Sequence, residues 1–168
     1  MEFENAGPGE NERCEEYSRT LAALGVATQP EWVLDTSNAA FTRAAKKLPF
    51  EKRFDFATAR IMSMRINERP TAWVGCNDYA MVALMRRMRQ MGARVPEDLS
   101  LVGVDDSPMA ALLVPTLTSV SQPLFEMGKI AATRLIERAE EGFEKCPHMF
   151  QKFSPALQAR ESSSQFKI

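Results

Sequence analysis

Two clusters of polar residues each follow a short apolar run, and their chemistry suits a ligand site. Asn77 and Asp78 come directly after the run 71–76, and Asp105 and Asp106 come after the run 99–104. An asparagine amide offers hydrogen-bond donors and an acceptor, and a carboxylate accepts hydrogen bonds from hydroxyl groups. The clusters therefore predict a site for a small polyhydroxylated or amide-bearing molecule. Helix capping by Asn77 and turn formation by the paired aspartates are the alternatives.

Motifs for catalysis or metal binding are not found. The sequence has no nucleophile elbow and no glycine-rich nucleotide motif, and His148 is its only histidine. Cys14, Cys76 and Cys146 form no CxxC pair, so we expect three reduced thiols and neither a disulfide framework nor a zinc site. Cys76 has no neighbouring base to activate it, and we expect it to pack as a small core residue. The sequence thus predicts no enzyme, no metal and no cofactor.

The composition is that of an ordinary globular protein and excludes several classes of function. The 168 residues are 45% hydrophobic and 26% charged, with 21 basic and 22 acidic residues. The resulting charge of −1 provides no overall attraction to nucleic acid or anionic lipid. The longest apolar runs are too short to cross a bilayer, and the first residues lack a signal-peptide pattern, so we predict a cytoplasmic protein without membrane contact.

The elements that would position the polar clusters form a βαβ unit. The runs 71–76 and 99–104 predict buried strands, and 78–91 predicts a helix that Asn77 caps and Gly92 ends. A unit of this length implies parallel strands with a right-handed crossover, and hence an α/β fold. If the strands are neighbours, Asn77 and Asp105 face the same crevice. Apolar residues at helical spacing predict a core face for the helix, with a protein interface as the alternative: Met81, Leu84, Met85, Met88 and Met91.

Further elements flank this unit. We expect helices at 10–24 and 123–141, the second with Pro123 as its first residue, and one or two helices within 37–67 interrupted near Pro49. Strands are predicted at 32–34, 117–121 and 157–159, and a polar tail from residue 162. The helix 123–141 has an apolar face suited to packing, formed by Leu124, Met127, Gly128, Ala131 and Leu135.

Four ordered segments resemble the sensor domain of the lac repressor family of bacterial transcription regulators. They are 70–78, 92–106, 115–123 and 155–162, and residues 7–25 resemble the entry to the second lobe of those sensors. The resemblance implies a periplasmic-binding-protein-like fold, a doubly wound parallel sheet in an α/β/α sandwich. It also implies two such lobes closing on a small effector, commonly a sugar or a nucleobase. Met81 departs from the family, which usually has a small residue there.

The resemblance also assigns residues and domains. Arg13, Asn77 and Asp105 fall where the family places polar effector contacts, and Gln122 falls at the crossing between lobes. Residues 1–122 would form the second lobe, and 123–152 a crossing helix and segment that pack on the first lobe. Residues 153–162 would be a return strand, and 163–168 a polar tail.

The function implied is the effector-sensing and dimerising part of a transcription regulator. We expect these residues to lack the first lobe and the DNA-binding head, so that DNA is bound only through a head outside them. The apolar face of the helix 123–141 would then lack its usual partner and favour self-association. Effector affinity is expected to be weak or absent. A transporter's solute-binding protein and a dimerising fragment that interferes with intact regulators are the alternatives.

Overall fold

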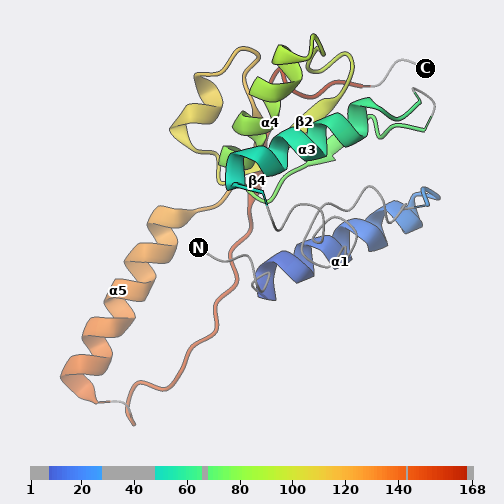
Figure 1. Cartoon of the computed structure of the whole chain (residues 1–168). Helices are drawn as coiled ribbons and strands as arrows, with labels where there is room; N and C mark the ends of the chain where they lie inside the picture. Colours follow the sequence, from blue (N-terminus) through green and yellow to red (C-terminus); the bar gives the residue numbers. More distant parts are fainter. Residues whose placement is uncertain (1–7, 28–47, 66–67, 143, 166–168) are drawn as a thin grey trace.

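The computed structural model describes residues 8–27, 48–65, 68–142 and 144–165 (Figure 1). Its elements along the chain are α1 (Pro8–Ala23), α3 (Phe50–Met62), β1 (Ala72–Val74), α4 (Asp78–Gln90), β2 (Ser100–Val104), the 3-10 helix η2 (Pro108–Ala111), β3 (Thr118–Ser121), α5 (Leu124–Glu141) and β4 (Ala156–Gln158). The predicted strand at 32–34 and the first part of the predicted helices within 37–67 lie outside the described residues.

The four strands form one sheet in the order β1-β2-β3-β4. β1 pairs with β2 and β2 with β3 in parallel, which confirms the βαβ unit. β4 pairs antiparallel with β3, Ser121 opposite Ala156, so the sheet is mixed at this edge. The α/β class is confirmed, and the antiparallel edge strand is the one departure from a wholly parallel sheet.

The core lies between the sheet and α4. α4 packs on β2, and α3 packs on α4 (Figure 1). Met81, Leu84, Met85 and Met88 are buried, while Met91 is exposed beyond the last turn. The methionine face of α4 is therefore core, as predicted, and flexible methionines fill the irregular space against the strands.

Gly75 explains how α4 accommodates Met81. A Cβ built on Gly75 would lie 2.3 Å from Met81 Cε and 2.8 Å from Met81 Cγ. Because glycine has no Cβ, the long Met81 side chain occupies this space after β1. The bulky residue at a position that is usually small in the family is thus matched by a missing side chain opposite it.

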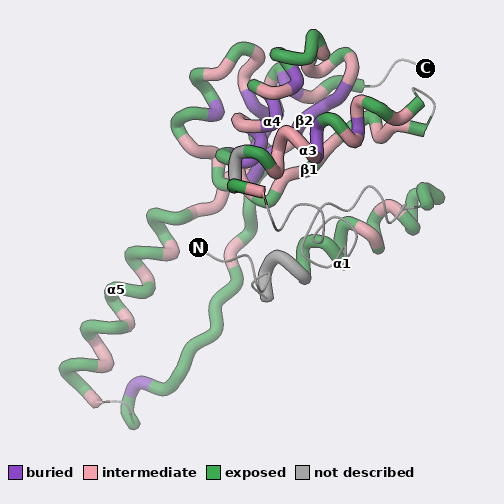
Figure 2. Tube along the Cα trace, in the orientation of Figure 1, coloured by how far each residue is buried: buried purple, intermediate pink, exposed green. Residues whose placement is uncertain are grey.

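α5 and the segment after it extend away from the sheet as an arm (Figures 1 and 2). We call α5 together with residues 144–155 the arm. None of the residues of α5 is buried, and Phe125 and Leu135 are 81% and 70% exposed. The apolar face predicted for packing is therefore not buried by the described residues, and its packing on a first lobe stays a prediction.

The predicted polar tail is wrong at its start. Ser162 is completely buried, and its backbone and hydroxyl both bond to the sheet. Ser163 and Ser164 continue this contact, through Thr118 and Ser100 respectively. A short run of serines resembles a solvated tail in sequence, but here the Ser162 hydroxyl bonds to backbone groups of β2 and β3. The Ser163 hydroxyl and the Ser164 backbone bond to side-chain hydroxyl groups of the sheet.

Candidate functional site

The carboxyl ends of β2 and β3 bring two predicted site residues together. Asp105 follows β2 and Gln122 follows β3, two neighbouring parallel strands. The Gln122 Nε2 group donates a hydrogen bond to Asp105 Oδ1 at 2.9 Å. Asp105 is exposed, so its carboxylate is accessible at the sheet edge where ligands bind in open parallel sheets.

Asn77 lies after β1, at the same edge of the sheet, and caps α4. The Ala80 N–H donates to Asn77 Oδ1 at 2.9 Å, which is the N-cap bond expected from the sequence. The capping alternative is therefore confirmed. An effector contact by Asn77 stays a prediction, and capping leaves its side-chain amide nitrogen as the group that would make it.

Arg13 is not brought to this edge. It lies on α1, where its side chain is exposed. The principal contacts between described elements join the sheet, α3, α4 and η2 and do not include α1. Figure 1 shows α1 apart from the sheet. A role for Arg13 in effector binding remains a prediction from the family resemblance.

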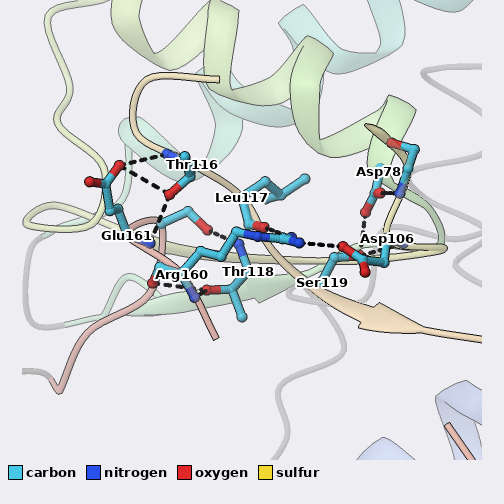
Figure 3. Close-up of polar contacts among 10 residues, drawn as sticks. Asp78, Asp106, Thr116, Leu117, Thr118, Ser119, Arg160 and Glu161 are labelled. Carbon is cyan, nitrogen blue, oxygen red and sulfur yellow. Dashed lines mark hydrogen bonds and ion pairs between the residues drawn. The ribbon is translucent and has the colours of Figure 1, made fainter. Parts of the chain in front are cut away.

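A buried carboxylate lies beneath the edge (Figure 3). Asp78 is 2% exposed. Its Oδ1 accepts a hydrogen bond from Ser119 Oγ at 2.5 Å, and its Oδ2 accepts one from the Ser107 N–H at 2.7 Å. The Asp106 N–H in turn donates to Ser119 Oγ at 3.0 Å. These bonds tie the start of α4, the middle of β3 and the turn after β2 into one polar network.

Gly103 makes room for this carboxylate. A Cβ built on Gly103 would lie 2.2 Å from Asp78 Oδ1 and 3.1 Å from Leu117 Cδ2. The strand therefore needs a residue without a side chain where the buried carboxylate crosses it.

Arg160 connects the network to the returning chain (Figure 3). Its Nη2 pairs with Asp106 Oδ1 at 2.6 Å, and its Nη1 donates to the Leu117 carbonyl at 2.7 Å. Both partners of the Arg160–Asp106 pair are about one-fifth exposed, with side-chain values of 21% and 20%. The Arg160 N–H also donates to Thr118 Oγ1 at 2.8 Å. The guanidinium thus holds the turn after β2 against β3.

Glu161 holds the next part of the returning chain. Its Oε2 accepts hydrogen bonds from the N–H and the hydroxyl of Thr116, at 2.9 and 3.0 Å (Figure 3). These two bonds, the backbone one first, stabilise the charged form and hold the pKa of Glu161 below its usual value. The carboxylate thereby fastens the last residues to the strand entering the sheet.

The turn itself has an unusual backbone. Asp105 and Asp106 have φ angles of 104° and 50°, in the left-handed region that residues other than glycine rarely adopt. Two such residues in succession persist only where their surroundings hold them, and such conformations concentrate at functional sites. Asp105 is held by its N–H bond to the Val120 carbonyl at 2.9 Å.

The sequence does not indicate Ser119 and Arg160 as site residues, and it places Asp78 in a polar cluster without indicating that this carboxylate is buried. An acidic residue in the first turn of a helix is explained by capping and the helix dipole, so Asp78 gives no signal of burial. The only sequence signals are small residues, Gly103 and Ser119, inside two apolar strands. The prediction that Cys76 packs in the core is wrong. Cys76 is exposed beyond the end of β1, because only three residues of the apolar run form the strand.

The described residues contain no group of three or more histidine, cysteine, aspartate or glutamate side chains that could hold a metal ion. None of the three cysteines forms a disulfide. Nor does any described helix combine the length and the hydropathy that a membrane span requires.

β1, β2 and β3 are parallel, and Asp105 and Gln122 follow two of them, which is the arrangement of an open α/β sheet whose ligands bind beyond the carboxyl ends of the strands. Comparison with known proteins agrees: residues 2–163 match the family described as periplasmic binding protein-like domain. The chain belongs to this family, and its relatives there are transcription regulators of the lac repressor type.

Two curated relatives illustrate the similarity. The HTH-type transcriptional repressor PurR of Aliivibrio fischeri is 33% identical over 130 residues, which cover 77% of this chain and 35% of the repressor. The ribose operon repressor of Haemophilus influenzae is 32% identical over 129 residues, with coverage of 75% and 34%. The chain thus spans about a third of the length of the curated relatives it matches.

Solved structures agree in fold. A LacI family regulator from Lactobacillus casei with bound sucrose superposes with a TM-score of 0.73 at 19% identity, covering 96% of this chain and 54% of that one. The transcriptional regulator CelR in complex with cellobiose gives a TM-score of 0.71 at 28% identity, covering 94% of this chain and 45% of that one.

Proposed function

We propose that this chain is the effector-sensing and dimerising part of a lac-repressor-like transcription regulator that works in the cytoplasm. In this proposal, residues 1–122 belong to the second lobe, 123–152 cross toward a first lobe, and 153–162 return. DNA is bound by a head outside these residues, which agrees with their charge of −1. The regulatory mechanism is a population shift, in which the effector favours one arrangement of the lobes.

The observation that carries this proposal is the hydrogen bond between Asp105 and Gln122. It places an exposed carboxylate and an amide 2.9 Å apart at the carboxyl edge of a parallel sheet. Together they offer acceptors and donors to a ligand with hydroxyl or amide groups. Sucrose and cellobiose are bound in structures of two neighbours, so a sugar is the first effector class to test, and a nucleobase the second.

Titration of the chain with sugars tests this site. Amide resonances in NMR spectra should shift saturably when sucrose, cellobiose or ribose is added, and the shifts should centre on residues 77, 105 and 122. We expect a weak dissociation constant, about 1 mM or above, because one lobe buries only part of a small ligand and leaves it largely hydrated. Asp105→Ala should abolish the shifts.

The control is Asp98→Ala, because Asp98 lies before β2 at the opposite end of that strand and bonds to Arg94. This variant should bind as the parent does. If the sugars and the free nucleobases adenine, guanine and hypoxanthine cause no shifts at this edge, or if Asp105→Ala leaves the shifts unchanged, the proposed effector site is wrong.

Dimerisation has its own candidate surface in the loop between β2 and β3. Met109, Leu112 and Val114 are 47%, 81% and 78% exposed. The loop with η2 projects from the sheet (Figure 2). Three exposed apolar side chains within six residues are typical of an interface with another protein, and the proposed partner is a second copy of the chain.

The double variant Leu112→Glu/Val114→Glu should weaken the dimer. Two large apolar side chains contribute roughly 1.5–3 kcal/mol each when buried, so their loss predicts a dimer dissociation constant raised about a hundredfold or more. Light scattering after size exclusion measures this. Leu135→Glu/Ile136→Glu on the arm, also exposed, is the matched control and should stay dimeric. If the control variant is monomeric and the loop variant remains dimeric, the proposed loop interface is wrong and the dimer forms through the arm.

A further inference from the structure

The two segments that join the arm to the sheet contact adjacent residues of the effector site. Gln122 lies at the exit toward α5 and donates to Asp105 at 2.9 Å. Arg160 lies just after β4, where the chain returns, and pairs with Asp106 at 2.6 Å. The sequence between these two contacts is the arm and the short strand β4 that carries its return. Asp105 and Asp106 are thus held by Gln122, where the chain leaves the sheet, and by Arg160, where it returns.

The backbone of these aspartates makes the contacts consequential. Both have positive φ angles, 104° and 50°, so relaxation to an ordinary turn would redirect both carboxylates. Three kinds of contact oppose this relaxation. The Asp105 N–H bonds to the Val120 carbonyl, and the Asp106 N–H bonds to Ser119 Oγ. In addition, the two carboxylates accept bonds from the side chains of Gln122 and Arg160.

We infer that the Asp105–Asp106 turn couples the position of the arm to effector binding, with Arg160 as a positioning residue for Asp105. The inference rests on the proposed function, because it names the regulation of that same site. A movement of the arm pulls on Gln122 and Arg160, and both transmit it to the turn that presents the Asp105 carboxylate. Linkage then requires the reverse effect: a ligand that fixes Asp105 also biases the arm.

Arg160 is suited to this role because it contacts two elements at once. Its guanidinium binds the Asp106 carboxylate and the Leu117 carbonyl, so the turn is fixed against the start of β3. Lysine keeps the positive charge, but its three N–H donors lie on one nitrogen and cannot match the planar fork that reaches both partners. Arg160→Lys should therefore restore part of the positioning that Arg160→Gln loses.

Hydrogen exchange of the ligand-free chain tests the return end. In Arg160→Gln, the amides of Asp105 and Asp106 should exchange at least tenfold faster, while the amide of the buried Met88 within α4 keeps its rate. The three-bond coupling between amide and α protons, which reports φ, should change at both aspartates. Arg160→Lys should give an intermediate result.

The matched control is Arg134→Gln. Arg134 also bonds one carboxylate and one carbonyl, those of Glu137 and Pro147, but within the arm. It should leave the exchange of Asp105 and Asp106 unchanged. If Arg160→Gln accelerates exchange of Met88 as much as that of the turn, or leaves the turn unchanged, Arg160 is not a positioning residue and the inference fails.

The exit end is tested from the opposite direction. Asp105→Ala removes the partner of Gln122 and should accelerate exchange of Leu124 and Met127 in the first turn of α5 at least threefold. Unchanged rates there would refute coupling to the arm. The ligand titration tests the proposed effector site separately: if that site is wrong, sucrose, cellobiose, ribose and the free nucleobases leave the NMR spectrum of the parent unchanged. The exchange comparisons need no ligand and test only the coupling between the turn and the arm.

Discussion

Gly103→Ala should destabilise the protein by about 3 kcal/mol or more, because it displaces a buried carboxylate. The new Cβ would lie 2.2 Å from Asp78 Oδ1, so the carboxylate must leave its position. Asp78 would then lose the bonds from Ser119 and the Ser107 amide while remaining among buried residues. Removing partners from a buried charge is one of the few single changes with an effect of this size.

Urea denaturation followed by circular dichroism measures the change. Gly128→Ala is the control, since a Cβ there meets nothing within 4 Å and the residue lies within α5. Alanine in an exposed helix should leave stability unchanged or raise it by roughly 0.5–1 kcal/mol. Equal denaturation midpoints for Gly103→Ala and the parent would show that the Asp78 network tolerates displacement.

Ser162→Ala should lower stability by about 2–4 kcal/mol, because it leaves two buried backbone groups without their partner. The Ser162 hydroxyl donates to the Leu101 carbonyl at 2.7 Å and accepts from the Thr118 N–H at 2.8 Å. It therefore bridges β2 and β3 where their direct pairing begins. Leu101 and Thr118 are both buried, so water cannot replace the hydroxyl without opening the sheet.

Ser154→Ala provides the comparison in the same denaturation experiment. Ser154 is an exposed serine of the returning segment, and its replacement should change stability by less than about 0.5 kcal/mol. Equal denaturation midpoints for the two variants would show that Ser162 contributes no more to stability than an exposed serine, as expected for the predicted polar tail.

The sheet and its helices could be predicted because they depend on local patterns. The apolar run before Asp105 and the helical spacing from Met81 to Met88 indicate side chains that are buried, whereas Ala72 and Val74 in the run before Asn77 are exposed, contrary to the prediction of a buried strand. Asp105 and Gln122 end neighbouring parallel strands, but the hydrogen bond between them is not among the predictions. Family resemblance, rather than pattern, supplied Gln122.

Other parts of the site depend on contacts between residues far apart in sequence. Asp78 is buried because Ser119 and Ser107 satisfy it, and Ser162 because two strands offer it unpaired backbone groups. Nothing near these residues in sequence indicates such partners. Cys76 shows the opposite error, since an apolar run predicts burial but the strand ends before that residue. Polar side chains are assigned correctly only once their tertiary partners are known.

The late position of Ser162 and Ser164 in the chain has a consequence for the order of folding. Their bonds to the sheet join residues 44, 61 and 64 positions apart, whereas β1, α4 and β2 follow one another directly. Pairings across such separations form after local ones, because a long loop must close first. Until then β3 is an unprotected edge strand, open to pairing with another chain. During folding, therefore, the time needed to close the loop that contains the arm determines how long the β3 edge of the sheet remains exposed to misassembly.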